Sequence, residues 1–477
     1  MNRRHLLQKT FVLGTAGLAQ SGCDWSGSPS TDVRIGICGF HGKGLHHIKD
    51  LVGRKGVRIT ALCDVDQRTI DIGLKEFENQ KIKPTVYKDY RKFVQDKEID
   101  GVIIATPNHS HTLIALHAIQ AGKHVYVEKP VCHNIVEGRK LVEAARKRPQ
   151  LIVTHGMQLR SDPSWDEAFA WLREGHLGPI TLSRGLNFKM RESIGKVTGP
   201  KKIAKYIDYD LWSACRPVVP LGREKLHYDW HWQWDYGNGD IGNQGPHQLD
   251  VARWALAQPK LPKRVLSIGK RWGYDDDGQT PNNQLALFDY APVPLLFDNR
   301  GLPLKNMDWK QEPVFKGIRI GNVVQCEGGW LAESRAYDAA GKAVKKFSSS
   351  GGADHMENWL RSIREGKPVS PHLDIENGHV SAGLAHLANI SHRLGQTLAR
   401  DGVAERLGKN PLVQEALGDF EANLGANGID LMADQAIAGP WLNFNPDTER
   451  FEGDHATEAN ALLDEDYRPG HELPVIT

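Results

Sequence analysis

The feature that most constrains the fold is a short apolar run that leads directly into a cluster of glycines. Residues 33–38 are mostly apolar, the glycine cluster occupies 39–44, and a helical pattern follows over 45–52. This order predicts a strand, a tight turn and a helix. Backbone N–H groups at the start of such a helix attract a pyrophosphate, and glycines let the main chain approach it closely.

The glycine spacing departs from the G-x-G-x-x-G pattern of dinucleotide-binding turns. Gly39 and Gly44 hold the outer positions, whereas His41 occupies the middle one and Gly42 follows it. A cluster of glycines alone often marks only a turn. Gly39, His41, Gly42 and Gly44 are therefore candidate phosphate contacts that need support from the rest of the chain.

A second apolar run, 57–63, ends at Asp64. An acidic residue at this distance from the first glycine holds the ribose hydroxyls in dinucleotide-binding folds, while the alternative is that Asp64 only caps the next helix. Its charge would repel a 2′-phosphate, which favours NAD as the cofactor. The nearby Arg68 keeps NADP open as an alternative.

Two further predicted strands, 101–105 and 124–127, deliver polar residues to the same edge of a parallel sheet, where ligands collect. The predicted cofactor contacts after them are Thr106, Pro107, Asn108, His111, Glu128 and Lys129. The alternative for Lys129, taken alone, is a surface ion pair with Glu128.

In combination these motifs resemble the Gfo/Idh/MocA family of glucose-fructose oxidoreductases, inositol dehydrogenases and MocA-type oxidoreductases, over about residues 33–393. The resemblance implies that Lys129 acts near the nicotinamide and the substrate hydroxyl. It also implies that Thr106, Pro107 and Asn108 line the nicotinamide side, and that Pro130 follows a constrained peptide that can be cis.

The second signature of that family falls within 240–254. Family members carry an Asp-x-x-x-His pair ahead of a helix, with the histidine accepting the proton of the sugar hydroxyl. His247 matches the histidine, whereas Asn243 stands where the aspartate is expected. An amide can orient the ring but supplies no counter-charge. Lys129 and His247 are the predicted catalytic residues, and the sequence does not decide which is the base.

Other candidates lie between these signatures. Gln158 is predicted to contact the cofactor and Arg160 the substrate. The alternative is that both side chains only form part of the polar rim of a loop. The predicted sugar-stacking residues in an aromatic segment over 227–236 are Tyr228, Trp230 and Trp232, and Asn243 and His247 complete the substrate set. Core packing is the alternative for the aromatic rings. No metal site is expected, because nothing completes a set with His227 and His231.

Composition limits the function classes. The 477 residues suggest two or three domains, 40% hydrophobic residues suffice for substantial cores, and a net charge of +2 gives no support for a nucleic-acid surface. The six cysteines are scattered and predict no disulfide framework.

Residues 1–30 resemble a twin-arginine export leader, with Arg3-Arg4 ahead of a weakly apolar run over 11–19. This predicts a periplasmic protein. A partial lipoprotein box makes a lipid anchor at Cys23 an alternative, and the apolar run is too short to span a bilayer.

The predicted fold class is α/β. Residues 31–155 are expected to form a Rossmann domain with a doubly wound parallel sheet. Residues 156–400 are expected to form a substrate and oligomerisation domain of α+β type, with a large, open, mostly antiparallel sheet. The strands predicted for it are 180–186, 264–268, 284–288, 295–298, 317–320 and 323–327, and helices are predicted over 355–365 and 376–394. Residues 401–477 are expected to form an extension with a helix-like piece over 411–417. The extension either wraps the second domain or covers a neighbour's site, and it has no predicted chemical role. The resemblance implies a homodimer or homotetramer, with the outer face of the second sheet as the contact.

The predicted function is an NAD(P)-dependent oxidoreductase that acts on a secondary hydroxyl of a sugar or polyol, with a tightly bound, internally recycled cofactor. Two alternatives remain open. One is an NAD-dependent glycoside hydrolase with transient oxidation at the sugar C3, and the other is a non-catalytic sugar-binding protein on the same fold.

Overall fold

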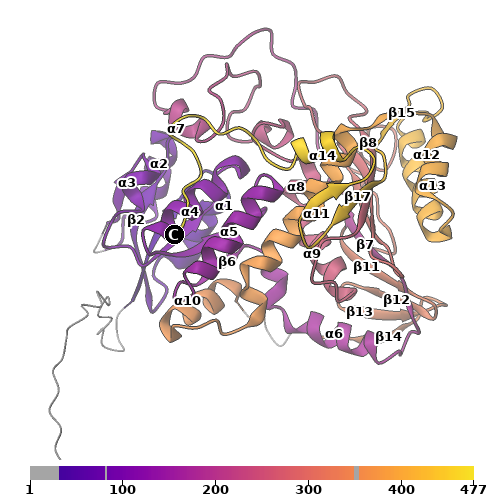
Figure 1. Ribbon diagram of the computed structural model, residues 1–477, viewed down its shortest axis with the longest axis horizontal. Coiled ribbons are helices and arrows are strands. Elements are labelled where there is room, and N and C mark those ends of the chain that lie inside the picture. Colours follow the sequence, from indigo (N-terminus) through magenta and orange to yellow (C-terminus); the bar gives the residue numbers. More distant parts are fainter. Residues whose placement is uncertain (1–31, 81–82, 349–353) are drawn as a thin grey trace, which may run out of the picture.

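The computed structural model describes residues 32–80, 83–348 and 354–477, and within them the chain forms two sheets (Figure 1). The first sheet is parallel and the second is mostly antiparallel, so the predicted fold class is confirmed. The predicted export leader and Cys23 lie outside the described residues. In the part of the chain described, no helix has both the length and the apolar character needed to cross a membrane.

The first sheet has the strand order β3-β2-β1-β4-β5-β6. Its strands are β1 (Val33–Cys38), β2 (Val57–Cys63), β3 (Thr85–Tyr87), β4 (Gly101–Ile104), β5 (His124–Val127) and β6 (Val153–His155). Neighbouring strands pair in parallel, and β1, β4 and β5 are almost continuously apolar and buried. This composition is typical of strands that helices cover on both faces.

The helices of the first domain are α1 (Lys43–Leu51), α2 (Gln67–Lys75), α3 (Tyr90–Phe93), α4 (His111–Gln120) and α5 (Ile135–Lys147). Asp66 and Asn134 cap the starts of α2 and α5, since each side chain accepts a hydrogen bond from a backbone N–H of the first turn. In contrast, no side chain caps the start of α1, which begins within the glycine turn, so its first N–H groups have no side-chain acceptor.

The second sheet has the order β14-β13-β12-β11-β7-β10-β9-β8-β16-β15, and β17 pairs with β8 and β18. Its strands are β7 (Ile180–Asn187), β8 (Arg264–Lys270), β9 (Asn283–Asp289), β10 (Leu295–Arg300), β11 (Ile320–Cys326), β12 (Gly329–Ala332), β13 (Arg335–Asp338), β14 (Ala343–Lys346), β15 (Gln396–Leu398), β16 (Ala436–Ala438), β17 (Leu442–Asn445) and β18 (Arg450–Glu452). The pairing of β7 with β10 is parallel, whereas the other pairings of this sheet are antiparallel.

One predicted strand of this sheet is wrong. Residues 317–320 form a turn at which Phe315 and Ile318 bridge, and β11 begins only at Ile320. Lys316 and Gly317 both have positive φ angles, of 47° and 80°, which an extended strand does not allow. The strands β12 to β14, which extend the sheet beyond β11, were not predicted.

The remaining helices are α6 (Pro163–Arg173), α7 (Tyr209–Ser213), α8 (Gly239–Asn243), α9 (Gly245–Ala255), α10 (His355–Glu365), α11 (Ile375–Arg393), α12 (Arg400–Leu407), α13 (Pro411–Ala426) and α14 (Ala456–Ala461). The two predicted helices α10 and α11 are present. α10 returns to the first sheet, where Trp359 and Leu360 pack with Ile35 and Ile103.

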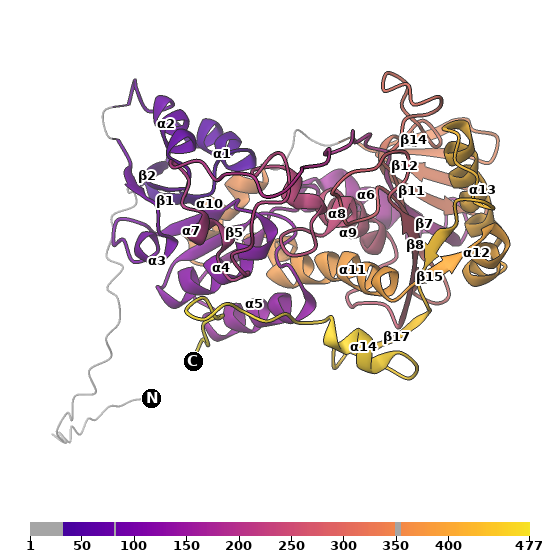
Figure 2. The same cartoon turned by 90° about the horizontal axis from the view of Figure 1, so that it is seen from above.

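Helices cover both faces of the second sheet (Figure 2). α9 and α11 lie between this sheet and the first domain, and Leu249 of α9 packs with Phe288 and Phe297. On the opposite face, α12 and α13 cover the side chains of β7 to β10, with Phe420 and Leu417 buried there. The extension therefore occupies part of the face that was expected to make an oligomer contact.

The last residues of the chain return to the first domain. Ile476 is buried in the core of that domain, and its carbonyl accepts a hydrogen bond from the Lys147 ammonium at 2.7 Å. Glu465 pairs with His133, in the loop after β5, at 2.8 Å, and with Arg216 at 2.7 Å. The extension thus adds strands to the second sheet and ties both domains together.

Candidate active site

A cavity of about 460 Å³ lies where the carboxyl edge of the first sheet faces loops of the second domain. The predicted site residues that line it are Gly39, His41, Gly42, Asp64, Thr106, Pro107, Asn108, His111, Glu128, Lys129, Gln158, Tyr228, Trp230, Asn243 and His247. We call the part lined by Gly39, Gly42 and Asp64 the glycine end, and the part lined by Lys129 and His247 the lysine end. Gly44, Arg160 and Trp232 do not line the cavity.

The glycine turn is shaped for close approach by a ligand. Gly39 has a φ of +77°, and a Cβ there would lie 2.6 Å from the Thr106 Cγ2. A Cβ on Gly44 would collide with the Gly39 carbonyl oxygen. A Cβ on Gly42, in contrast, would meet nothing within 4 Å, so this residue faces open space beside the uncapped start of α1. The backbone here can receive a phosphate group.

Asp64 follows β2 and is buried at the glycine end. Its carboxylate accepts hydrogen bonds from the backbone N–H groups of Phe40, at 2.9 Å, and Asp66, at 3.0 Å. Burial raises the pKa of Asp64 to about 6, although these two bonds act in the opposite direction. The carboxylate therefore supports the glycine turn as well as lining the cavity. Arg68 does not line the cavity, since its guanidinium lies 4.0 Å from the Tyr206 ring centroid.

Glu128 is buried under the floor of the cavity at the end of β5. His47 of α1 lies 2.9 Å from its Oε1, and its Oε2 accepts from the Lys129 backbone N–H at 3.2 Å. Burial alone would raise the pKa of Glu128, but the bond from His47 and the charges of His47 and Lys129 outweigh it and lower the pKa to about 2. Glu128 is thus a fixed anion between the glycine turn and Lys129.

Lys129 reaches across the cavity to the second domain. Its ammonium donates to the Asn243 carbonyl oxygen at 2.6 Å and lies 3.4 Å from the Asn243 Oδ1. Burial lowers the pKa of Lys129 to about 8, while the neighbouring Glu128 acts to raise it. The peptide between Lys129 and Pro130 is cis, in agreement with the expectation from the family resemblance.

His247 and Asn243 come from consecutive helices. Asn243 ends α8, and His247 lies in the first turn of α9 after Pro246. Burial lowers the pKa of His247 to about 3, and the charge of Lys129 acts in the same direction. The imidazole is therefore neutral near pH 7, and it forms no hydrogen bond with the residues that the structure describes. Asn243 meets Lys129 instead of the ring of His247.

His111 fixes two walls of the cavity relative to each other. One ring nitrogen lies 2.7 Å from the Pro130 carbonyl oxygen, and the other lies 2.7 Å from the Thr106 carbonyl oxygen. Because both contacts are to main-chain oxygens, the ring ties the loop after β4 to the loop after β5. Gln158 lies close by and donates to the Tyr126 hydroxyl at 3.1 Å.

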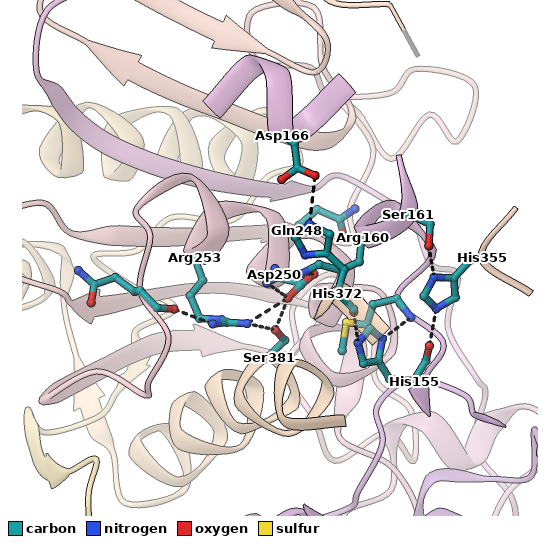
Figure 3. A network of polar contacts seen from close by, with 12 residues as sticks. His155, Arg160, Ser161, Asp166, Gln248, Asp250, Arg253, His355, His372 and Ser381 are labelled. Carbon is teal, nitrogen blue, oxygen red and sulfur yellow. Dashed lines mark hydrogen bonds and ion pairs between the residues drawn. The ribbon is translucent and has the colours of Figure 1, made fainter. Parts of the chain in front are cut away.

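Arg160 lies behind the cavity in a buried network of polar side chains (Figure 3). Its Nε and Nη2 donate to Asp250 at 2.7 and 2.8 Å, and Asp250 also accepts from Ser381 at 2.6 Å. Asp250 stands one helical turn after His247 on α9. The structure thus places Arg160 where it holds this helix, and it does not bring the guanidinium to the substrate position that was predicted.

Trp232 is also outside the cavity, because its ring is buried and its Nε1 donates to Asp240 at 3.3 Å. The sequence missed two site residues near the lysine end. His231 lines the cavity beside Trp230. Arg191 donates to Asp240 at 3.0 Å and to the Tyr228 hydroxyl at 2.7 Å. Asp240 and Tyr228 are distant from Arg191 along the chain, so no spacing signal pointed to Arg191.

His41 and His227 meet over the glycine end. Their rings stack with centroids 4.3 Å apart, and the His227 Nε2 lies 2.8 Å from the Asp66 Oδ2. Both histidines line the cavity. Among the described residues, no group of three or more side chains is arranged to hold a metal ion.

Two family models match the chain. Residues 33–155 match the oxidoreductase family described as an NAD-binding Rossmann fold, and residues 175–269 match the C-terminal alpha/beta domain of the same oxidoreductase family. Over these two regions the chain belongs to the Gfo/Idh/MocA family. The second match includes β7, α8, α9 and β8, and therefore both Asn243 and His247.

Curated relatives match only part of the chain. A glycosyl hydrolase family 109 protein from Shewanella sp. (strain MR-4) is 34% identical over 120 residues, which is 24% of this chain and 26% of the relative. Inositol 2-dehydrogenase from Salmonella agona (strain SL483) is 26% identical over 157 residues, which is 33% of this chain and 46% of the relative. The matches thus span less than half the length of either relative.

Solved structures share the fold over most of the chain. The WlbA dehydrogenase from Bordetella pertussis, in complex with NADH and UDP-GlcNAcA, has a TM-score of 0.55 at 17% identity and covers 75% of this chain and 96% of its own. Levoglucosan dehydrogenase, in complex with NADH and levoglucosan, has a TM-score of 0.54 at 17% identity and covers 75% of this chain and 97% of its own. At this identity the likeness concerns the fold alone.

Proposed function

We propose that the protein is an NAD-dependent oxidoreductase that acts on a secondary hydroxyl of a sugar or polyol. One observation carries the proposal: Lys129 and His247, from different domains, line the same cavity as the glycine turn and Asp64. Oxidation of an alcohol requires a hydride acceptor and a proton acceptor at one carbon. The inositol and levoglucosan dehydrogenases among the similar proteins carry out reactions of this type.

The residues of the glycine end fit NAD. The glycine turn would hold the pyrophosphate, Asp64 the adenosine ribose, and Thr106 to Asn108 the nicotinamide side. When bound, NAD would supply the acceptor for the hydride of the carbinol carbon. NAD is preferred over NADP, because Asp64 is a carboxylate and Arg68 lies against Tyr206 away from the cavity.

The pKa values at the lysine end support one assignment of the proton chemistry. Because burial lowers the pKa of Lys129 to about 8, a part of the amine is neutral near pH 7 and can accept the hydroxyl proton at Nζ. His247, with its pKa lowered to about 3, is neutral but a weak base. In this mechanism Lys129 is the base, and His247 orients the hydroxyl by a hydrogen bond.

Contacts over the glycine end support a retained cofactor that is recycled in the site. Besides the stack of His41 on His227, the Asp208 N–H donates to the Val65 carbonyl, and the Gln67 N–H donates to the Tyr206 carbonyl, each at 3.0 Å. These bonds fasten the loop of the second domain beside Asp64. Such a cover slows the release of a nucleotide beneath it.

The test uses protein loaded with NAD and a panel of polyols and methyl glycosides. The proposal expects at least one of them to reduce the bound nicotinamide, seen by its absorbance, and Lys129→Met to abolish this reduction. For a retained cofactor, the reduced nucleotide stays with the protein during gel filtration. Failure of every polyol and sugar to reduce the cofactor would contradict the proposal.

Glycoside cleavage is the second candidate, favoured by the match to glycosyl hydrolase family 109 proteins. Oxidation at the sugar C3 makes the proton at C2 acidic, the aglycone leaves from C1, water adds across the double bond, and the C3 carbonyl takes back the hydride. The net reaction is hydrolysis without net NADH. Cleavage of nitrophenyl glycosides in deuterated water would label C2 by this route, whereas direct hydrolysis leaves C2 unlabelled.

A further inference from the structure

His231 lines the cavity from a short helical turn that ends at Trp232. The turn packs against α8, and the Trp232 Nε1 donates to Asp240 of that helix at 3.3 Å. α8 ends at Asn243, whose carbonyl oxygen accepts from the Lys129 ammonium at 2.6 Å. One short helix therefore fixes the position of His231 relative to the lysine end.

The backbone determines which nitrogen of His231 carries the proton. Nδ1 lies 2.6 Å from the Tyr228 carbonyl oxygen, which can only accept, so Nδ1 is the donor. Burial lowers the pKa of His231 to about 3, although the bond to Tyr228 opposes this, and the ring is therefore neutral near pH 7. Nε2 consequently has a lone pair and no proton.

Neighbouring rings hold the imidazole of His231 in one orientation. It stacks on Trp230 with centroids 3.7 Å apart and planes 19° apart, and the Tyr228 ring packs against it at 5.0 Å. Arg191 in turn holds Tyr228 by donating to its hydroxyl at 2.7 Å. The Nε2 of His231 forms no hydrogen bond with any residue that the structure describes, and protein atoms do not fully enclose it. The cavity wall thus carries a hydrogen-bond acceptor that is held ready for a ligand.

Taking the proposed function as the basis, we infer that His231 is a specificity-determining residue whose Nε2 accepts a hydrogen bond from a second hydroxyl of the sugar or polyol. Lys129 and His247 take the hydroxyl that is oxidised, so the partner of His231 is a different one. Because Nδ1 is committed to the backbone, the ring cannot reverse its polarity. Hydrogen or fluorine in place of this hydroxyl leaves Nε2 without a donor, and a site of this kind rejects such analogues.

The experiment replaces single hydroxyls of three parent compounds: methyl glucoside, methyl galactoside and myo-inositol. NAD-loaded protein is given each parent and its analogues with hydrogen or fluorine at one position, and equilibrium binding and kcat/KM are measured. We expect replacement of one particular hydroxyl to weaken binding by about tenfold to a hundredfold, because an enclosed acceptor then lacks its partner.

The variant His231→Phe identifies that hydroxyl. It keeps a flat ring on Trp230 but removes the acceptor, so it should weaken binding of the parent compound by a similar factor. In this variant, replacement of the paired hydroxyl should cost little more, whereas replacement at the other positions should cost as much as before. The matched control is His176→Phe, because His176 also stacks on a tryptophan, Trp171, at 4.6 Å but does not line the cavity. It should leave every affinity unchanged.

Nitrogen NMR of the histidine rings adds a measurement on the unchanged protein. The His231 ring, assigned by its loss in His231→Phe or His231→Gln, should be neutral with the proton on Nδ1. Its Nε2 signal should shift when the parent compound binds, and should not shift with the analogue that lacks the paired hydroxyl. A proton on Nε2 in the unliganded protein would overturn the inference.

The outcomes distinguish this inference from the proposed function. Compounds that bind in a His231-dependent way, but are never oxidised, would support the inference and contradict the proposed oxidoreductase activity. Compounds that are oxidised, with losses in His231→Phe that simply add at every position, would overturn the inference and leave the activity intact. Weaker NAD binding in His231→Phe with unchanged sugar affinity would overturn it as well, since the acceptor would then serve the cofactor. Failure of all parent compounds to bind would count against both.

Discussion

The two ends of the cavity are built in different ways. The glycine end comes from short, neighbouring stretches of one parallel sheet, and its contacts are largely main-chain groups at the ends of β1, β2 and β4. The lysine end combines Lys129 of the first domain with Asn243 and His247 of the second, and it is held by ion pairs between distant residues such as Arg160 and Asp250. The glycine end is thus built from neighbouring elements of one domain, whereas the lysine end depends on how the two domains pack.

This difference predicts that nucleotide binding depends on the glycine end and that catalysis depends on the lysine end. Changes at the glycine end should act on the affinity for the nucleotide, while changes at the lysine end should act on turnover and on the stability of the domain contact.

The largest expected effect comes from Lys129→Met. Removal of the amine takes away the proposed base, which is worth about a hundredfold to ten-thousandfold in kcat. Binding of NAD, measured by calorimetry, should remain within about threefold of the unchanged protein, since the glycine end is intact. If Lys129→Met loses affinity for NAD but its NAD-bound fraction turns over at the normal rate, Lys129 serves binding and not catalysis. If the unchanged protein binds a sugar but never turns it over, a non-catalytic binding protein is the better explanation.

Asp250→Asn should have the next largest effect, on stability. The substitution leaves the buried guanidiniums of Arg160 and Arg253 without their anion, which costs about 3–5 kcal/mol of unfolding free energy. Urea denaturation measures the loss. Asp166→Asn is the matched control, because the pair of Asp166 with His372 is exposed and should be worth less than about 1 kcal/mol. Equal effects of the two substitutions would show that the buried pair does not hold α9 in place.

The glycines allow a finer comparison within one turn. Gly39→Ala should destabilise the unliganded protein by about 1–3 kcal/mol, because of its positive φ and its contact with Thr106. Gly42→Ala should leave the melting temperature of the unliganded protein unchanged, since its Cβ meets open space, yet weaken NAD binding by about tenfold. Unchanged NAD affinity in Gly42→Ala would place the pyrophosphate elsewhere.

The smallest expected effect is a shift in the pH profile. Protonated Lys129 cannot accept a proton, so kcat/KM should rise with pH and level off above the pKa of about 8. Burial favours the neutral amine, which moves this limb below the ordinary lysine range. A kcat/KM that is already constant below pH 7, without a limb near 8, would instead favour His247 as the base, because burial lowers its pKa to about 3.

The sequence predicted the glycine end better than the lysine end. Apolar runs in the sequence identify the strands that precede the glycine turn, Asp64 and the Glu128-Lys129 pair. These residues could therefore be expected to meet at one edge of the sheet. Arg160 was misplaced because its partner Asp250 lies 90 residues further along the chain.

The same contrast holds for the fold. The first sheet and the helices α10 and α11 follow clear periodic patterns, and the structure contains them. The short strands β12 to β14 and β15 to β18 depend on pairing with strands already in the sheet, and their sequences alone do not specify that partner. The helix-like piece predicted over 411–417 is the first part of α13, whereas the position of α12 and α13 on the outer face depends on tertiary packing that the sequence alone does not specify.

The most direct test of the account is mass spectrometry of the small molecules released when the purified protein is denatured. The account predicts NAD or NADH in an amount that approaches one per chain, with little NADP. A protein that is empty, and that also fails to bind added NAD, would contradict the account and leave sugar binding as the better explanation of the cavity.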